Sequence, residues 1–437
     1  MSISRRNFMK YTSAVFAAGA VLPASLATAS SRSVSASDRI NVALIGCKTH
    51  GWRDLRTFLP RPDVRCVALA DVNKNHLTMR ADVVEKSGHK VDTYSDYRKI
   101  LDRKDVDVVL IATPDHWHCL QFVDACAAGK DVYTQKPIGN TIAECDVMVA
   151  AARKYNRVVQ VGQQTHSAKH IKAMIEYLRS GKLGTIARVH AWANFGYGAI
   201  PRVVPDSTVP EGLDYDTWLG PAPLRTFNSR RHDGSWRMFW DYGGGLQTDY
   251  GVHLFDFALW GMNVQTLPKR ILGHGEKFYY PNGMHETFDT QTITYQFDDF
   301  VMVWEHNTVQ TGPYGRNYGV AFCGTNGTMV VNIEGWQVYP ATQRAEQLPE
   351  TSMANDGLQF DDHVADFVEC VKTRNRQTAC PIETGSLCAK YAHIGNIAAR
   401  MGGAALRYDD ARQRFDNSEA DRYIRPNYRA PWKFPVV

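Results

Sequence analysis

The stretch Ile40-Asn41-Val42-Ala43-Leu44-Ile45-Gly46-Cys47-Lys48-Thr49-His50-Gly51 decides the fold of this chain. Its first six residues form a nearly continuous apolar run, which is typical of a parallel strand buried on both faces. Gly46 and Gly51 indicate a tight turn into a helix, and the backbone N–H groups of such a turn can bind a pyrophosphate. Lys48 stands where a second glycine normally lets the phosphates approach. The stretch therefore predicts a dinucleotide site with one departure from the usual pattern.

Similar apolar runs alternate with helix-like stretches up to residue 161. The expected strands are 40–45, 64–70, 106–112, 131–134 and 158–161. The expected helices are 76–87, 97–101, 122–128 and 141–155, the last opened by a capping box, Thr141-Ile142-Ala143-Glu144. This alternation predicts an α/β fold, with a doubly wound parallel sheet in a Rossmann domain over residues 39–161.

The pattern changes over residues 162–437. One amphipathic helix is expected at 171–178, and late helices at 363–371 and 389–401. The β-rich segments are 186–193, 287–297, 301–305, 318–323 and 329–333. Such clustering predicts a C-terminal α+β domain that carries a large, mostly antiparallel open sheet.

The first 29 residues have the order of an export signal. Arg5 and Arg6 precede an apolar run at 14–22, and Ala27-Thr28-Ala29 has the small-x-small form of a cleavage site. The arginine pair resembles a twin-arginine (Tat) signal. We therefore expect residues 1–29 to direct a folded protein to the Tat translocase and the periplasm, with 30–38 as a serine-rich linker. The alternative is a disordered basic N-terminus with a chance arginine pair.

Charge and cysteine content narrow the class of protein. The 437 residues carry a net charge of +5, and loss of Arg5, Arg6 and Lys10 with the signal leaves +2. No basic run interleaves with aromatic residues, so we expect no nucleic-acid partner. The nine cysteines are scattered, and no close-spaced Cys or His pair of zinc type is present. We expect free thiols, as in a chain that folds in reducing cytoplasm, and no metal site.

Asp71 ends the second expected strand, 20 residues after Gly51. A carboxylate there can accept hydrogen bonds from a ribose diol and would repel a 2′-phosphate, which favours NAD over NADP. The alternative is a doubly wound domain that has lost its nucleotide. The expected cofactor-binding residues are Gly46, Lys48, Thr49, Gly51, Asp71, Thr113, Pro114, His116, His118, Gln135 and Lys136.

Two groups of residues are candidates for catalysis. Lys136 follows a strand at the carboxyl edge of the sheet, where its ammonium group could hydrogen-bond a reacting hydroxyl. Asp249 and His253 lie four residues apart, so on a helix they share a face and the carboxylate can orient the imidazole. An Asp/His pair on a helix is structural more often than catalytic. The pairs His116/His118 and His166/His170 lack a third metal ligand.

The chain resembles the Gfo/Idh/MocA (glucose–fructose oxidoreductase / inositol dehydrogenase) family. The matching segments are 70–72, 112–116, Lys136-Pro137, 218–223, 243–253 and 395–398. The resemblance implies a Rossmann domain and a C-terminal domain whose open sheet supports a homo-oligomer, either a dimer or a tetramer. It also implies that Lys136 contacts substrate and cofactor and that His253, beside Asp249, is the general base. Gln135 in place of the usual Glu, and Lys48, depart from the family pattern.

The residues and the resemblance together predict an exported NAD-dependent oxidoreductase that acts on a secondary hydroxyl of a sugar, glycoside or polyol. Trp192, Asn194, Trp236 and Arg237 are the expected sugar contacts, with ordinary packing as the alternative. Two other functions stay open. One is a redox-neutral NAD-dependent glycosidase, which oxidises a sugar carbon transiently, eliminates the aglycone and re-reduces the sugar. The other is a sugar-binding protein with a defunct nucleotide site.

Overall fold

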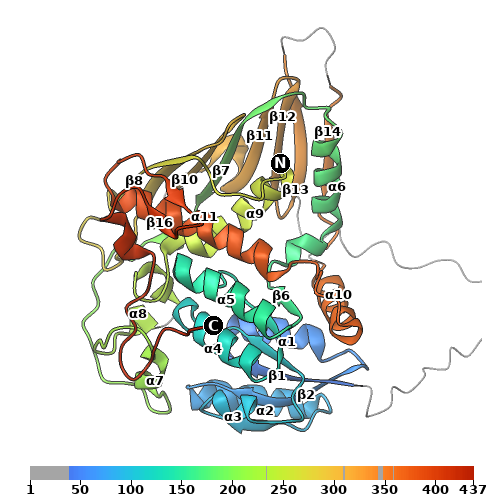
Figure 1. Cartoon of the computed structure of the whole chain (residues 1–437), viewed down its shortest axis with the longest axis vertical. Coiled ribbons are helices and arrows are strands. Elements are labelled where there is room, and N and C mark those ends of the chain that lie inside the picture. Colours follow the sequence, from blue (N-terminus) through green and yellow to red (C-terminus); the bar gives the residue numbers. More distant parts are fainter. Residues whose placement is uncertain (1–38, 233, 309–310, 343–347, 358) are drawn as a thin grey trace, which may run out of the picture.

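The structure of the chain is a computed structural model that describes residues 39–437, except 233, 309–310, 343–347 and 358. The expected Tat signal (1–29) and the linker (30–38) therefore both lie outside the described residues. Figure 1 shows two sheets at opposite ends of the molecule, with helices between them.

The first sheet is parallel throughout. Its strands are β1 (Ile40–Ile45), β2 (Val64–Ala70), β3 (Asp92–Tyr94), β4 (Val108–Ile111), β5 (Asp131–Thr134) and β6 (Val159–Val161). They lie in the order β3-β2-β1-β4-β5-β6. This order is that of a doubly wound dinucleotide-binding sheet, and the predicted fold class is confirmed.

Five helices flank this sheet. They are α1 (Thr49–Phe58), α2 (Lys74–Lys86), α3 (Arg98–Leu101), α4 (Asp115–Ala127) and α5 (Ile142–Lys154). The capping box at α5 is formed, since Thr141 Oγ1 accepts a hydrogen bond of 3.3 Å from the N–H of Glu144. The prediction for α4 was wrong at its start, because the helix begins at Asp115 and Pro114 occupies its N-cap position.

The second sheet has eight strands in the order β14-β13-β12-β11-β7-β10-β9-β8. Their bounds are β7 (Ile186–Asn194), β8 (Arg270–Glu276), β9 (Thr290–Gln296), β10 (Val301–Asn307), β11 (Tyr318–Gly324), β12 (Gly327–Asn332), β13 (Gly335–Pro340) and β14 (Thr351–Ala354). Only the β7/β10 pair is parallel among them. The expected mostly antiparallel sheet is confirmed.

One face of the second sheet packs against α6 (Lys169–Arg179), α9 (Val252–Gly261) and α11 (Ile382–Arg400) (Figure 1). Phe255 of α9 lies at the centre of this core, with ring centroids 5.7 Å from Tyr295 and 5.4 Å from Trp304. Because α9 is held between the sheet and α11, the residues at its N-terminal end have a fixed position relative to the first domain.

Late segments of the chain return to the first domain. Helix α10 (Phe360–Thr373) packs on α1, with the rings of Phe58 and Phe367 6.4 Å apart. Near the C-terminus, the ring of Trp432 lies 4.9 Å from that of Trp117. Residues beyond 162 therefore complete the core of the Rossmann domain as well as forming the second sheet.

All nine cysteines are free thiols, and eight of them are buried. Within the described part of the chain, no helix combines the length and apolar character needed to cross a bilayer.

Candidate active site

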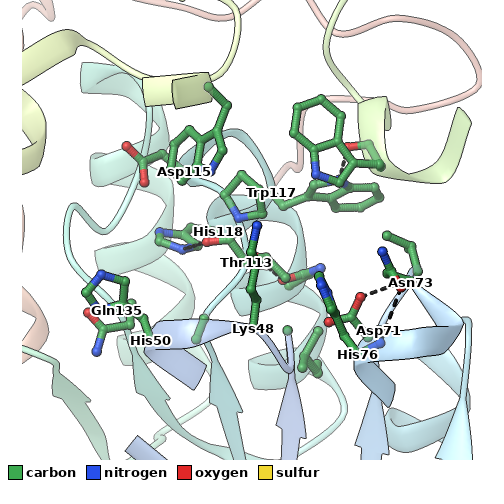
Figure 2. A pocket seen from close by; sticks show the side chains of 18 of the residues that line it. Lys48, His50, Asp71, Asn73, His76, Thr113, Asp115, Trp117, His118 and Gln135 are labelled. Carbon is green, nitrogen blue, oxygen red and sulfur yellow. Dashed lines mark hydrogen bonds between the residues drawn. The ribbon is translucent and has the colours of Figure 1, made fainter. Parts of the chain in front are cut away.

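A cavity of about 190 Å³ lies at the carboxyl edge of the first sheet. Figure 2 shows its lining side chains, among them Lys48, Asp71, Thr113 and His118 from the turns that follow the parallel strands. Residues between 213 and 237 of the second domain form the facing wall. The cavity therefore occupies the place where doubly wound sheets bind nucleotides, and it is closed by the C-terminal half of the chain.

The glycine turn matches the dinucleotide-binding pattern at Gly46 and Gly51. Gly46 has φ +92°, and a Cβ there would lie 2.7 Å from the carbonyl oxygen of Ala112. A Cβ at Gly51 would lie 1.9 Å from the carbonyl oxygen of Gly46. Lys48, at the N-cap of α1, has φ −77°, a conformation open to any side chain. Lys48 therefore causes no backbone strain in the turn.

Asp71 joins the end of β2 to the glycine turn. Its Oδ2 accepts a hydrogen bond of 2.7 Å from the N–H of Cys47, and its Oδ1 accepts one of 2.8 Å from the N–H of Asn73. Burial raises the pKa of this carboxyl group, while those two N–H groups act in the opposite direction. Asp71 also lines the cavity, as the expected ribose-binding role requires.

A strap from the second domain, residues 212–214, is hydrogen-bonded to the loop after β2. The N–H of Asp214 donates to the carbonyl of Val72 at 2.9 Å, and the N–H of Lys74 donates to the carbonyl of Gly212 at 2.8 Å. Leu213 and Asn73 form an antiparallel bridge between these bonds. Since Leu213 lines the cavity beside Asp71, the strap closes the nucleotide cleft at its ribose side.

Some of the residues that follow β4 line the cavity, and others lie outside it. Thr113, Pro114 and His118 line the cavity. The ring of His118 lies between two carbonyl groups, with Nδ1 2.7 Å from the oxygen of Pro137 and Nε2 2.8 Å from that of Thr113. His116 was expected at the cofactor but lies outside this cavity, with Nε2 3.0 Å from the carbonyl oxygen of Trp218. The helical start at Asp115 rotates His116 away from the first cavity.

Four side chains meet where β5 and the start of α9 approach each other. Lys136 Nζ donates to Asp249 twice, at 2.5 Å to the carbonyl oxygen and 3.0 Å to Oδ1. Arg237 Nε donates to the same Oδ1 at 2.9 Å, and the hydroxyl of Tyr197 donates to Oδ2 at 3.1 Å. Asp249 lies in a π-helical turn, Gln247–Gly251, immediately before α9. Such turns are frequent at functional sites.

Charges in this cluster set the protonation states of its members. Burial alone would raise the pKa of Asp249, but the neighbouring charges of Lys136 and Arg237 outweigh it and hold that pKa below its usual range. Burial, reinforced by Lys136, lowers the pKa of His253 well below its ordinary value. His253 is therefore a neutral imidazole at neutral pH, the form in which it can accept a proton.

Asp249 does not orient the imidazole of His253 in the way expected from the sequence. Both oxygens of the carboxylate are engaged by Lys136, Arg237 and Tyr197, and no hydrogen bond joins Asp249 to His253 within the described residues. The ring of His253 instead lies 5.8 Å from that of Tyr250, in an edge-on contact. Asp249 therefore holds the two cations of the cluster.

Gln135 lines the cavity, but its amide also binds a buried carboxyl group of α1. Nε2 of Gln135 donates to Asp54 Oδ2 at 2.6 Å, and Nε2 of Gln164 lies 3.4 Å from Asp54 Oδ1. Burial raises the pKa of Asp54 to about 7. The carboxyl group next to this part of the sheet therefore belongs to Asp54 of α1 and not to residue 135.

The four expected sugar contacts separate into two pairs. Trp236 and Arg237 line the cavity, with the guanidinium carbon of Arg237 4.2 Å from the centre of the indole. Trp192 is fully buried on the sheet face opposite the helices, where Nε1 donates to the carbonyl of Arg316. Asn194 is buried at the end of β7, and its Oδ1 accepts from the N–H of Asn307. The structure does not bring Trp192 or Asn194 to the cavity.

Sequence reasoning missed several residues of the site. His50 and Asp115 line the cavity, and Tyr197 binds Asp249. His50 lies in the glycine turn, so its position was available from the motif. Asp115 is 4% exposed, and burial raises its pKa well above the usual value. Tyr197 and the strap reach the site from distant parts of the chain, and no local pattern indicates them.

Together the parallel sheet, glycine turn and Asp71 define a dinucleotide-binding oxidoreductase. Residues 40–163 match the NAD-binding Rossmann fold of the oxidoreductase family Gfo/Idh/MocA, and residues 185–434 match the C-terminal alpha/beta domain of that family. The chain belongs to the Gfo/Idh/MocA family, and its first domain is an NAD-binding domain.

Two kinds of curated protein are similar to this chain, an oxidoreductase and a glycosyl hydrolase. The uncharacterized oxidoreductase YrbE of Bacillus subtilis (strain 168) is 23% identical over 292 residues, covering 66% of this chain and 73% of YrbE. Glycosyl hydrolase family 109 protein 1 of Shewanella sp. (strain ANA-3) is 24% identical over 368 residues, covering 75% of this chain and 73% of that protein.

Solved structures share the same fold. Levoglucosan dehydrogenase in complex with NADH and levoglucosan superposes with a TM-score of 0.63 at 19% identity, covering 84% of this chain and 99% of that one. An inositol dehydrogenase homolog from Azotobacter vinelandii, in complex with NADH and myo-inositol, gives 0.64 at 17% identity, covering 85% and 98%.

Proposed function

We propose that this chain oxidises a secondary hydroxyl group of a sugar, glycoside or polyol, with NAD as the hydride acceptor. The observation that carries the proposal is the cluster of Lys136, Arg237 and Asp249 at the carboxyl edge of the NAD-binding sheet. The cluster places two cations beside a cavity that has a tryptophan in its wall. Cationic donors and an aromatic face suit the hydroxyl groups and C–H surfaces of a carbohydrate.

The residues that would hold NAD fit the cofactor. Gly46 and Gly51 permit the tight turn that brings the start of α1 to the cavity, where backbone N–H groups can bind a pyrophosphate, and Asp71 is placed for a ribose diol. When bound, NAD supplies the hydride acceptor of the reaction. Lys136 would donate a hydrogen bond to the reacting oxygen and stabilise its developing negative charge. Asp249 fixes the position of Lys136 by two hydrogen bonds.

His253 is the proposed general base. It is neutral at neutral pH because burial and Lys136 lower its pKa. It lies in the first turn of α9, and the π-helical turn immediately before α9 presents Asp249 to Lys136. A neutral imidazole there can take the hydroxyl proton as the hydride leaves the carbon.

Two measurements test the dehydrogenase proposal. Purified protein is denatured and the supernatant is assayed for nicotinamide nucleotide, and the native protein is titrated with added NAD. NADH formation is then followed with inositols, aldoses and anhydro-sugars as substrates. We expect bound nucleotide and NADH formation with at least one polyol. Protein that neither contains nor binds NAD would refute the proposal.

The strap favours a second candidate, the redox-neutral glycosidase. Two backbone hydrogen bonds and a β-bridge close the cleft beside Asp71, so bound NAD would exchange slowly with solution. An enzyme that regenerates its cofactor in place does not need exchange. The similarity to the family 109 glycosyl hydrolase agrees with this candidate.

Aryl glycosides distinguish the two candidates. Release of the aryl alcohol with no net NADH, from protein without added NAD, would support the glycosidase and exclude the simple dehydrogenase. Net NADH formation in proportion to the substrate consumed, with no aglycone release, would support the dehydrogenase and exclude the glycosidase. The matched control is the Lys136→Met variant, which should be inactive in both assays.

We also propose that the protein is exported by the Tat translocase to the periplasm and acts there as a dimer or tetramer. The arginine pair and small-x-small site support export, and the absence of disulfides among the nine cysteines agrees with folding before export. Replacing Arg5 and Arg6 by lysine should retain the protein in the cytoplasm. Sedimentation of the mature protein measures its oligomeric state, and a monomer would contradict the proposed assembly.

A further inference from the structure

A second cavity, of about 240 Å³, lies between the two domains and away from the glycine turn. Its walls come from the start of α5, from residues 240–244, from the C-terminal half of α11 and from residues 422–428. Figure 1 shows α5 and α11 side by side, with the end of the chain close to α4 and α5. None of the roles proposed above involves this cavity.

Arg400 of α11 is the central cation of this cavity. Its guanidinium carbon lies 3.9 Å from the ring centre of Tyr423 and 4.6 Å from that of Trp240. Burial lowers the pKa of Arg400, an effect that expresses the cost of keeping its charge out of water. Among the described residues, no carboxylate lies at ion-pair distance from Arg400. Its charge is stabilised by the two aromatic faces, by a side-chain hydrogen bond with Tyr423 and, from farther away, by the charge of Glu286, which is itself paired with Arg225.

The other charged groups of the cavity increase its positive potential. Arg425 also lines the cavity and has no ion pair among the described side chains, and Arg422 forms an exposed pair with Glu419. The two acidic residues of the wall are already engaged. Asp241 pairs with Arg225 at 2.5 Å. Glu144 accepts a hydrogen bond of 2.5 Å from Tyr428.

Burial also reduces the charge that Glu144 contributes, although the hydrogen bond from Tyr428 acts in the opposite direction. The pKa of Glu144 is raised to about 7, chiefly by burial, so a large fraction of this carboxyl group is protonated near neutral pH. The cavity thus has three guanidinium groups and little free negative charge. An anion that presents two oxygens would satisfy Arg400, since the planar guanidinium group binds carboxylate, sulfate and phosphate through paired N–H donors.

We propose that this second cavity binds a small molecule that carries one oxyanion group, held by Arg400 with Arg422 and Arg425. Trp240 and Tyr423 line the same cavity and hold the guanidinium group of Arg400 in position. The cavity is a binding site separate from the redox centre. It adjoins that centre through residues 236–244, which line the first cavity at Arg237 and the second at Trp240.

Calorimetric titration of the NAD-saturated protein tests this proposal, because saturation blocks anion binding at the glycine turn. The probes are glucuronate, glucose 6-sulfate and glucose 6-phosphate, with glucose and inorganic sulfate as comparisons, all at one ionic strength. We expect at least one charged sugar to bind and glucose not to bind at this site. The three charged probes identify which oxyanion the site prefers, and inorganic sulfate shows whether the ring contributes.

Variants locate the binding. Arg400→Gln should weaken the preferred probe about tenfold or more, as expected for loss of a charge-assisted pair. Arg425→Gln, at an exposed position, should weaken binding of the preferred probe several-fold. It replaces Arg400→Gln as the test if that variant fails to fold. Arg412→Gln, exposed on the hairpin between β15 (Tyr408–Asp409) and β16 (Arg414–Phe415), should have no effect. Equal binding of glucuronate and glucose, or unchanged binding in the folded Arg400 and Arg425 variants, would overturn the proposal.

Discussion

The amide of Gln135 donates a hydrogen bond of 2.6 Å to the buried carboxyl group of Asp54. The sequence showed that Gln135 removes a negative charge next to Lys136 relative to the family pattern. The structure adds the reason that a glutamate is disfavoured in this chain. Asp54 is 3% exposed, and a second carboxylate at hydrogen-bond distance would repel it. Gln135 and Asp54 therefore depend on each other, because an amide can donate a hydrogen bond to the buried carboxyl group and a second carboxylate cannot.

Gln135→Glu is predicted to destabilise the protein. Two adjacent buried carboxyl groups cannot both ionise, so the pair must keep a proton or separate. We expect the free energy of unfolding to fall by about 3 kcal/mol near neutral pH, with a smaller loss at pH 5 where one group is protonated. Urea unfolding at several pH values measures this. Adding Asp54→Asn to Gln135→Glu should restore most of the loss, and a double variant no more stable than Gln135→Glu would contradict the pairing.

Asp54 also predicts a pH dependence of stability in the wild-type protein. Its pKa is raised to about 7 in the folded state, against about 3.9 in an unfolded chain. The folded state therefore binds more protons than the unfolded state between these values, so this carboxyl group lowers stability as pH rises from 4 to 7. Asp54→Asn should flatten the melting temperature over that range. The exposed Asp298→Asn serves as control, and a parallel profile for Asp54→Asn and wild type would refute the assignment.

Asp249→Asn is predicted to disable the reaction while the cofactor stays bound. The ionised carboxylate holds Lys136 and Arg237, and Asn offers one weaker acceptor to both. We expect kcat to fall about 100-fold, the effect of losing one preorganised charge interaction. NAD content should be unchanged, because Asp249 does not line the nucleotide cavity. A variant with wild-type kcat would show that Lys136 needs no anchor.

Local sequence patterns were sufficient for five of the six strands of the Rossmann sheet, which are short and mostly apolar runs. They missed β3 (Asp92–Tyr94), a short polar strand at the edge of the sheet. They did not determine which face of a strand a residue occupies. Trp192 lies between Ala191 and Ala193, and these two alanines pack on the helix side. Neighbouring strand residues point to opposite faces, so Trp192 points away from the helices, a parity that depends on the register of the whole sheet. Long-range contacts such as the strap likewise have no local signal.

The start of α4 was missed for a chemical reason. The residues 115–119, Asp-His-Trp-His-Cys, have no helical hydrophobic period because they are buried on all sides, as part of a helix between the sheet and the second domain. A period is visible only when one face of a helix meets water. Because the helix begins at Asp115, Asp115 lines the first cavity and His116 lies outside it.

Three imidazoles lie near Lys136, and both ring nitrogens of one of them, His118, already face carbonyl oxygens. The last prediction separates the roles of the other two. Burial and the charge of Lys136 lower the pKa of His253 well below its usual value, and the same two causes lower that of His50 to about 4. Of these two, only His50 lines the nucleotide cavity, in the first turn of α1, whereas His253 lies on α9 behind Asp249. We therefore expect His50 to affect cofactor binding and His253 to affect proton transfer.

Accordingly, His253→Ala should lower kcat by 10²- to 10⁴-fold (an order-of-magnitude range) with NAD content unchanged. His50→Ala should release NAD more readily and retain most of kcat at saturating NAD. Because a base acts in its neutral form, kcat/KM should stay level as pH falls through 6.5 and decline only at lower pH. If His50→Ala lost kcat at full NAD occupancy while His253→Ala did not, the general base would be His50. A decline centred at pH 6.5 would show that the catalytic imidazole is solvated and is neither His50 nor His253.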